Sequence, residues 1–336
     1  MVFAQLFLML MLILIASEVF TNALEHLGEK LGISEGVTGS IFAAVATALP
    51  ETSVPLLALL AGAQSVHAKG VNEEIGIGAI LGAPLMLATL SICLMALSVW
   101  KSRTMLGHLR PERTGLTRDL NFFIAAFSFA AIALFIPHEL TFVRFGIGIG
   151  MILIYITYVI ITIRASKGLV KDGHATEAEG MMLLCKIGLP NNMPVILIQL
   201  ILGLVLMLLG AKGFIDGVEQ ASHLIGISTL MLSLLIIPIA TELPEKVNSI
   251  LWIRKGKDTL AFGNITGAMV FQGTLLPAIG IMMTSWQPRP EVTPGILITL
   301  VAAIWLRYLM VKDGIRVWHL LVNGALYIIY IIIALL

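Results

Sequence analysis

Long runs of apolar residues, separated by short polar segments, follow one another along the whole chain. A transmembrane helix needs about 20 mostly apolar residues to cross a hydrocarbon core of roughly 30 Å. Runs of this length recur often enough to predict ten such helices. Their approximate limits are residues 2–24, 36–62, 75–99, 119–137, 142–164, 191–215, 226–253, 259–284, 292–310 and 316–336.

The composition indicates a polytopic membrane protein that is not an enzyme. Apolar residues make up 58% of the 336 residues and charged residues only 12%, proportions unlike those of a soluble globular chain. Cys93 and Cys185 show no CxxC spacing, so we expect neither a disulfide framework nor a thiolate metal site. No nucleophile is arranged with a base or a metal triad, so we expect no catalysis, no resident cofactor and no nucleic-acid partner.

The basic residues indicate how the chain is oriented. With the N-terminus outside, only Lys69, Arg144, Lys212 and Arg289 lie in outward loops or helix ends, and Lys246 lies within a span. The remaining Lys and Arg residues fall in inward loops, as the positive-inside rule requires. We therefore expect a multi-pass protein of the plasma membrane, surrounded by lipid, monomeric, and with both termini extracellular.

One short motif occurs twice. ATALPE at residues 46–51 reappears as ATELPE at 240–245, and the same offset aligns LGIS at 31–34 with IGIS at 225–228. Each half contains five predicted spans, and because five is odd the halves enter the membrane in opposite directions. Inverted repeats of this kind build secondary transporters whose sites lie at the repeat interface near the midplane.

The repeat predicts the organisation of the whole chain. We expect an all-α polytopic membrane protein with ten transmembrane helices as two inverted five-helix repeats. Residues 1–165 would form the first repeat, 166–190 a cytoplasmic linker and 191–336 the second repeat. The connection at 165–193 is interpreted as a plain linker, and a regulatory segment or a short interfacial helix is the alternative.

A proline precedes the glutamate in each copy of the motif. Pro50 and Pro244 have no backbone N–H, so they leave the carbonyls of Ala46 and Ala240 without a helical donor. Free carbonyls inside a membrane are tolerated only where protein, water or an ion satisfies them. We therefore predict an interrupted helix in each half.

Oxygen-bearing side chains accompany both predicted breaks. Thr47 lies four residues before Glu51, and residues at this spacing share a helix face. Thr241 and Glu245 repeat the spacing in the second half. Carboxylate, hydroxyl and backbone oxygens are hard ligands that suit Ca²⁺ or Na⁺, so the pattern predicts a site for inorganic cations. The alternative is that both glutamates are neutral and only join helices by hydrogen bonds.

Motifs in both halves match those of a known family. They are the repeated T-x-L-P-E, the glycine-spaced spans that follow it, and the segments SEVFTNAL at 17–24 and AKGFIDGV at 211–218. In these motifs the chain resembles the sodium/calcium exchanger family, within the cation/calcium antiporter superfamily. The resemblance implies a secondary active antiporter that exchanges Ca²⁺ for Na⁺ or H⁺ by alternating access.

The resemblance also implies roles for particular residues. Glu51 and Glu245 would bind Ca²⁺ and Na⁺ in turn, with Thr47 and Thr241 beside them and backbone carbonyl ligands near Ala44 and Pro238. The second, third, seventh and eighth helices would form the ion core, and the first and sixth would slide across it.

The chain departs from the family pattern where Na⁺ ligands are expected. The family's third span has polar residues at three positions after a glycine. In this chain they are Ala83, Pro84 and Leu87 after Gly82, and Ala268, Met269 and Gln272 after Gly267. Gln272 is either a neutral cation ligand or a partner in an interhelical hydrogen bond. These losses leave the coupling ion open between Na⁺ and H⁺. They also leave a non-transporting, degenerate homologue as an alternative.

Two ionisable residues are added in the second copy of the motif. Glu242 lies three residues before Glu245, and Lys246 lies four residues after Glu242, the favourable order for a helix pair. In one interpretation Lys246 neutralises Glu242 and substitutes for a bound Na⁺. In the other it extends to water at the back of the helix, without a role in transport. A third carboxylate could instead carry a proton, because like charges that share a site raise one pKa.

Overall fold

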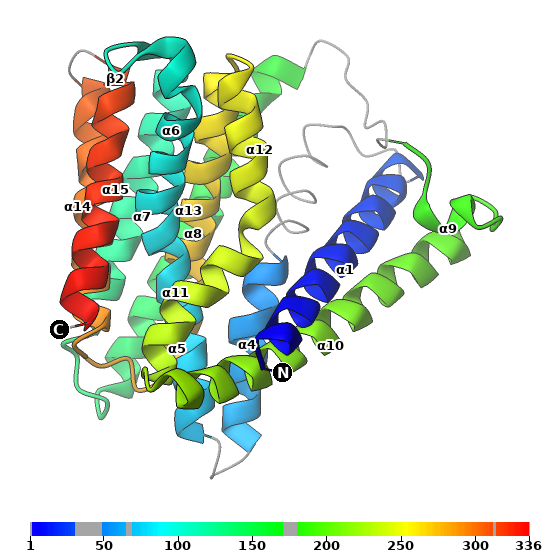
Figure 1. Ribbon diagram of the computed structural model, residues 1–336, viewed down its shortest axis with the longest axis horizontal. Coiled ribbons are helices and arrows are strands. Elements are labelled where there is room, and N and C mark those ends of the chain that lie inside the picture. Colours follow the sequence, from blue (N-terminus) through cyan, green and yellow to red (C-terminus); the bar gives the residue numbers. More distant parts are fainter. Residues whose placement is uncertain (1, 31–48, 65–68, 171–179, 312–313, 336) are drawn as a thin grey trace.

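The protein is a bundle of long helices that run roughly side by side (Figure 1). The computed structural model describes residues 2–30, 49–64, 69–170, 180–311 and 314–335. In the first half the helices are α1 (Val2–Lys30), α4 (Leu49–Gln64), α5 (Lys69–Met86), the π-helical turn η2 (Leu87–Ser91), α6 (Ile92–Arg103), α7 (Arg113–Ala133) and α8 (Thr141–Val170).

In the rest of the described chain, a four-residue helix in the predicted linker is followed by longer helices. They are α9 (Leu183–Lys186), α10 (Met193–Ile225), α11 (Thr229–Thr241), α12 (Leu243–Arg254), α13 (Asp258–Met283), α14 (Val292–Val311) and α15 (Val317–Leu335). The strands β1 (His108–Leu109) and β2 (Ile315–Arg316) pair antiparallel in a short ribbon at one end of the bundle (Figure 1).

Eight helical segments in the described part of the chain are long and apolar enough to cross a membrane. The predicted span at 226–253 is instead two shorter helices, α11 and α12, which are interrupted at Glu242. Of the predicted span at 36–62, only the part that forms α4 lies within the described residues. The count of ten helices and the inverted repeat therefore stay predictions.

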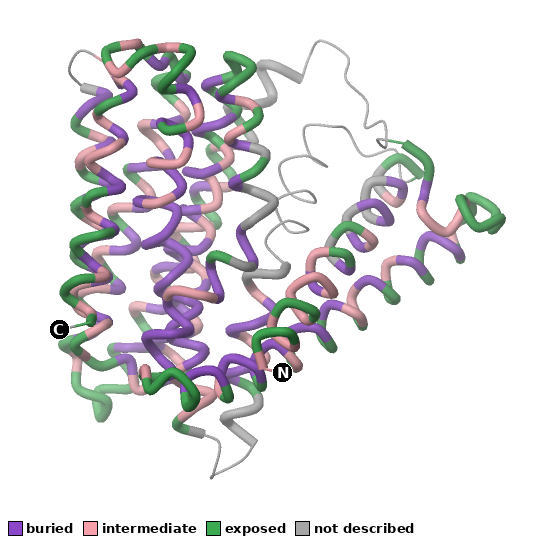
Figure 2. Tube along the Cα trace, viewed as in Figure 1, coloured by how far each residue is buried: buried purple, intermediate pink, exposed green. Residues whose placement is uncertain are grey.

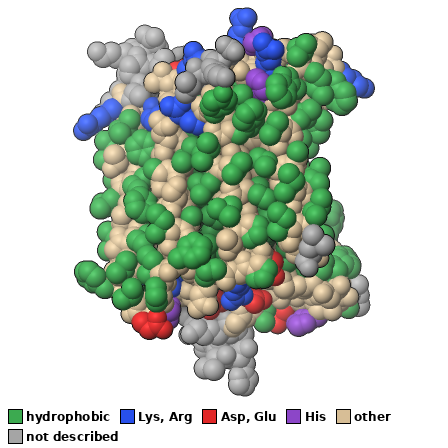
Figure 3. All heavy atoms as spheres, turned by 90° about the vertical axis from the view of Figure 1, so that its left-hand side faces the viewer, with side chains coloured by type: hydrophobic (Ala, Val, Ile, Leu, Met, Phe, Trp, Pro, Cys, Tyr) green, Lys and Arg blue, Asp and Glu red, His purple; other side chains and the backbone are tan. Residues whose placement is uncertain are grey.

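Outward-facing side chains form an apolar belt between two polar ends. Figure 3 shows hydrophobic side chains over the middle of the molecule, Lys and Arg towards the end with the ribbon, and Asp and Glu towards the other end. Large apolar side chains are exposed within the belt, for example Phe142 at 91% and Leu209 at 57%. An apolar belt of this extent needs lipid rather than water around it. The protein is a multi-pass membrane protein.

The buried residues lie where helices face one another (Figure 2). The larger cluster fills the space between α5, α6, α7, α13, α14 and α15, and includes Phe123, Phe127 and Trp286. A smaller cluster joins α1 and α10 to α4, α5 and α11, and includes Ile13 and Phe214. The bundle therefore has one main core, with the α1–α10 pair packed against its side.

Helices α1 and α10 approach each other closely along a row of glycines. A Cβ added at Gly203, Gly210 or Gly217 of α10 would lie 2.8 to 2.9 Å from atoms of α1, closer than real Cβ atoms approach. The three glycines are seven residues apart and so occupy one face of the helix. The pair α1–α10 is thus a packed unit of its own, tilted away from the other helices in Figure 1.

Candidate cation site

The residues predicted to bind a cation lie in or beside α4, α11, α12 and α13. Thr47 lies outside the described residues. For Glu51 in α4 and Glu245 in α12 the structure describes the helical backbone. The geometry of the site comes from the side chains of Thr241, Glu242, Lys246 and Gln272.

The helix α11–α12 is interrupted where the sequence predicts. Helix α11 ends at Thr241, and Glu242 has φ −93° and ψ 12° before α12 begins. The cause is Pro244, which stands in the first turn of α12 and has no N–H to continue the ladder of α11. The backbone N–H of Glu242 instead donates to the carbonyl of Pro238 over 3.2 Å.

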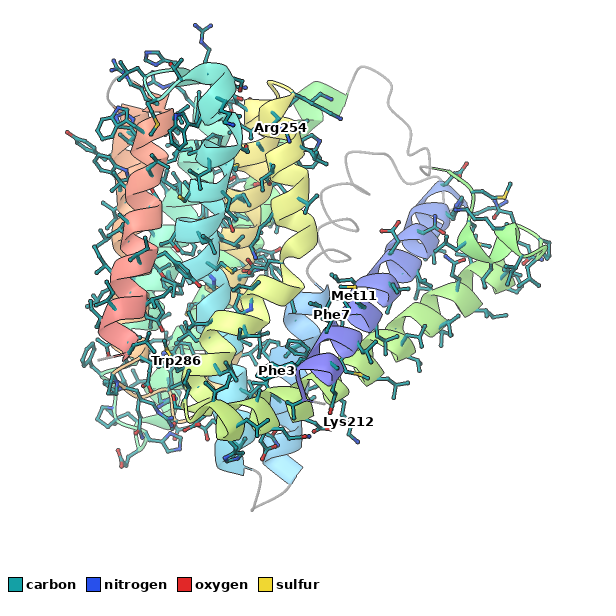
Figure 4. All side chains as sticks on the ribbon, viewed as in Figure 1. Phe3, Phe7, Met11, Lys212, Arg254 and Trp286 are labelled. Carbon is teal, nitrogen blue, oxygen red and sulfur yellow. The ribbon has the colours of Figure 1, made fainter. Side chains whose placement is uncertain are left out.

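The break lies near the middle of the membrane. Helix α11 has 13 residues on one side of it and α12 has 12 on the other, so each arm is roughly 18 to 20 Å long. Figure 4 shows Arg254 at the end of α12 nearest the ribbon, with Trp286 and Lys212 near the opposite end of the molecule. The two arms together span the apolar belt.

Glycines of α5 let this broken helix pack tightly. A Cβ on Gly82 would lie 2.2 Å from the carbonyl oxygen of Leu234 and 2.7 Å from Cγ of Pro238. A Cβ on Gly78 would lie 2.7 Å from Cβ of Ser233. No residue larger than glycine fits without movement, so α5 holds α11 in direct backbone contact beside Pro238.

A buried ion pair occupies the break. The side chain of Glu242 is 0% exposed and that of Lys246 is 6% exposed. Nζ of Lys246 lies 3.6 Å from Oε2 of Glu242 and donates a hydrogen bond of 2.8 Å to the carbonyl of Pro238. The ammonium therefore points into the protein at the break. A carboxylate buried to this degree is costly unless a cation accompanies it.

Thr241 ends α11 at the break, and Gln272 lies on α13, which packs against α12. The buried hydroxyl of Thr241 donates to the carbonyl of Ile237 over 3.1 Å, which leaves its lone pairs able to bind a cation. Gln272 is 1% exposed, and its Oε1 has no hydrogen-bond partner among the described residues. Helix α13, which carries Gln272, packs against both α5 and α12. A buried acceptor without a partner costs about 1 to 3 kcal/mol, so Gln272 would gain from a bound cation.

The predicted convergence of three carboxylates involves the side chains of Glu51 and Glu245, which lie outside the described residues. Among the described residues, no three His, Cys, Asp or Glu side chains lie close enough to hold a metal ion. The side chains of Glu51 and Glu245 are outside that comparison. The predicted convergence of three carboxylates therefore stays a prediction.

Two buried charged residues, Asp119 and Arg144, contact α13 and are not indicated by the sequence pattern. Asp119 of α7 accepts hydrogen bonds from Tyr158 over 3.1 Å and from Thr266 of α13 over 2.8 Å. Arg144 of α8 is 2% exposed and donates to the carbonyls of Ile281, Thr284 and Ser285. Both stand close to the predicted limits of apolar runs, where a charge normally marks a helix end. A charge at such a position does not indicate whether its side chain turns inwards.

A family model described as sodium/calcium exchanger protein matches residues 1–164 and 195–336. The chain belongs to the sodium/calcium exchanger protein family. Members of this family are antiporters, so the family is one of ion transporters and not of enzymes. The resemblance drawn from the repeated T-x-L-P-E motif is confirmed.

Relatives and solved structures agree with this assignment. The inner membrane protein YrbG of Escherichia coli (strain K12) is 23% identical over 290 residues, which cover 85% of this chain and 81% of YrbG. The structure of the H⁺/Ca²⁺ exchanger CAX superposes with a TM-score of 0.71 at 17% identity, covering 100% of this chain and 82% of CAX. The sodium-calcium exchanger NCX_Mj superposes with a TM-score of 0.59 at 22% identity, covering 99% of each chain. At such identities the likeness establishes the fold.

Proposed function

We propose that the protein is a secondary active antiporter that exchanges Ca²⁺ for Na⁺ or H⁺ across the plasma membrane by alternating access. The observation that carries the proposal is the break between α11 and α12, where Thr241 and Glu242 are buried, in a chain of the exchanger family. Interrupted helices that expose backbone oxygens are the usual ion sites of secondary transporters.

In the proposed site, Glu51 and Glu245 bind the transported cation from opposite sides. Thr47 and Thr241 stand four residues before them, and Gln272 contributes its amide oxygen from α13. All these atoms are hard oxygen donors, as Ca²⁺ prefers. The motifs ATALPE and ATELPE share five of six residues, and one lies in each of the repeats 1–165 and 191–336. We propose that these repeats are inverted and that residues 166–190 connect them.

The α1–α10 pair is the proposed moving element. Its glycine row makes it one packed unit, whereas α5, α7 and α13 share the main core. Sliding of a packed pair over a fixed core changes which side of the site is open and leaves the core contacts intact.

The charge distribution supports the proposed orientation. Lys and Arg gather at the end with the ribbon (Figure 3), and both chain ends lie towards the other end (Figure 1). By the positive-inside rule the ribbon end is cytoplasmic and the termini are extracellular. We propose that one copy of the chain is sufficient for transport, because both halves of the site belong to it.

The coupling ion is the finer question. The fold is shared by an exchanger coupled to H⁺ and one coupled to Na⁺, so it does not favour either. The replacement of the family's polar residues by Ala83, Leu87 and Ala268 favours H⁺, because oxygen ligands for Na⁺ are reduced. A non-transporting homologue is the remaining candidate.

Reconstitution into liposomes tests the proposal. The vesicles receive ⁴⁵Ca²⁺ outside, and an outward Na⁺ gradient or an outward H⁺ gradient is imposed separately. We expect uptake with one of the two gradients and its loss in Glu51→Gln and in Glu245→Gln. Glu139→Gln is the matched control, because Glu139 is an exposed acid in a loop. If neither gradient drives Ca²⁺ uptake, or if uptake is unchanged in both glutamate variants, the protein is not such an exchanger.

A further inference from the structure

Lys246 binds where a cation would be expected. Its ammonium is held by a backbone carbonyl at 2.8 Å and faces a carboxylate at 3.6 Å. Both oxygens belong to hard donor groups of the kind that bind Na⁺ or Ca²⁺, and neither group is exposed to solvent. The position therefore has the chemistry of a small cation site, with a side-chain ammonium as its occupant.

The carbonyl of Pro238 is suited to this role by the break in the helix. It already accepts the backbone N–H of Glu242 over 3.2 Å, and Lys246 takes its second lone pair. Because Lys246 is eight residues further along, it reaches back across the interruption. The ammonium thus joins α12 to α11 at the site where the helical ladder is broken.

An ordinary surface lysine would not adopt this arrangement. Lysine side chains near the end of α12, such as Lys255, are exposed. Burial of Lys246 costs free energy, because its ammonium loses hydration and its side chain loses rotamer freedom. Strong interactions with its partners must offset this cost. The neighbouring Glu242 needs a positive charge, because it is entirely buried.

We propose that the ammonium of Lys246 is a built-in cation that fills an alkali-ion position between Glu242 and Pro238, so that this position takes up no Na⁺. The inference rests on the proposed function in so far as it makes the position part of the ion pathway. A tethered charge cannot be exchanged. The protein would therefore bind and release one alkali ion fewer in each cycle than an exchanger in which this position is open to Na⁺. Removal of the lysine is expected to create a Na⁺ site.

Thermal unfolding of the purified, full-length protein in detergent tests this assignment. The midpoint is measured in NaCl and in N-methyl-D-glucamine chloride at equal ionic strength, for the wild type and for Lys246→Ala. A ligand that binds only the folded state raises the midpoint in proportion to RT ln(1 + [L]/Kd). We expect the Na⁺-induced rise to be larger in Lys246→Ala than in the wild type by about 3 °C or more, at a Na⁺ concentration about 100 times the Kd.

Two variants serve as controls. Lys246→Arg keeps a cation at the position and should respond to Na⁺ as the wild type does. Lys255→Ala removes an equal charge from the exposed end of the same helix and should also respond as the wild type does. Equal Na⁺-induced rises in Lys246→Ala and the wild type would overturn the assignment.

A variant that keeps the hydrogen bond guards against loss of folding. If Lys246→Ala does not fold, the comparison is made with Lys246→Gln, whose amide NH₂ can still donate to Pro238 while the charge is absent. A larger Na⁺ response in this variant supports the assignment, and a response equal to that of the wild type contradicts it. The assay measures Na⁺ binding and not transport, so its result is distinguishable from a failure to exchange Ca²⁺.

Discussion

Gly82 offers a sharp test of the packing that holds the broken helix. In Gly82→Ala the new Cβ would start 2.2 Å from the carbonyl oxygen of Leu234, and contacts below 3.0 Å are not found for real Cβ atoms. Helices α5 and α11 must therefore separate by at least 3.0 − 2.2 = 0.8 Å at this point. The nearest atoms belong to backbone and to a proline ring, which cannot rotate away as a flexible side chain can.

The expected cost follows from overpacking. Forcing extra atoms into a well-packed core typically costs about 1 to 3 kcal/mol, and the same movement displaces Pro238, which holds Lys246. Alanine favours the helical backbone over glycine by about 1 kcal/mol, which offsets part of the loss. We expect a net destabilisation of up to about 2 kcal/mol and a lower rate of Ca²⁺ transport.

Gly267→Ala is the matched control, because Gly267 precedes an alanine within α13 as Gly82 does within α5. A Cβ at Gly267 would meet only the hydroxyl of Tyr158, at an ordinary 3.9 Å. Thermal unfolding of the two variants in detergent, beside the wild type, measures the difference. Gly82→Ala should unfold at a lower temperature and Gly267→Ala at the wild-type temperature or above. Equal midpoints for the two variants would refute the close contact between α5 and α11.

Three further predictions concern helix ends and the α1–α10 pair. The carboxylate of Glu112 accepts backbone hydrogen bonds at the start of α7, which lower its pKa, so its stabilisation is present at neutral pH and is lost as pH falls through that lowered value. Glu112→Ala should lower the free energy of unfolding by about 0.5 to 2 kcal/mol at pH 7. The difference in thermal unfolding midpoint from the wild type should vanish at low pH. A difference that stays constant with pH would disprove the capping role. Arg144→Met should destabilise by about 3 kcal/mol or more, because three carbonyls at the end of α13 lose their donor, and unfolding at the wild-type temperature would contradict this. Gly210→Leu should loosen the contact of α1 with α10, since even a Cβ would lie 2.9 Å from Ile13. Amide hydrogen exchange in α1 should then rise several-fold. Gly150→Leu, where the added side chain enters open space, should leave that exchange unchanged.

The sequence was sufficient for features that depend on local chemistry. Apolar length predicts the spans because a helix in lipid must satisfy its own backbone, and Pro244 predicts the interruption because it lacks an N–H. The ion pair of Glu242 with Lys246 follows from their spacing of four residues. The spacing did not decide between a buried and a hydrated ammonium, because that choice depends on the groups packed around α12.

Features that depend on packing between distant helices were beyond the sequence. Asp119 accepts a hydrogen bond from Thr266, which is 147 residues away in the sequence. A hydropathy pattern does not identify a partner at this separation. The buried state of Arg144 likewise depends on the end of α13. The π-helical turn η2 follows Pro84 by three residues, yet a proline predicts a disturbance and not its form.

Calcium self-exchange tests the central claim most directly, because it needs no knowledge of the coupling ion. Proteoliposomes are loaded with ⁴⁵Ca²⁺ and diluted into medium with or without unlabelled Ca²⁺. An antiporter with one alternating site should release label faster when Ca²⁺ is present outside, and Glu245→Gln should abolish that acceleration. Release that is independent of external Ca²⁺ in the wild type would contradict the account.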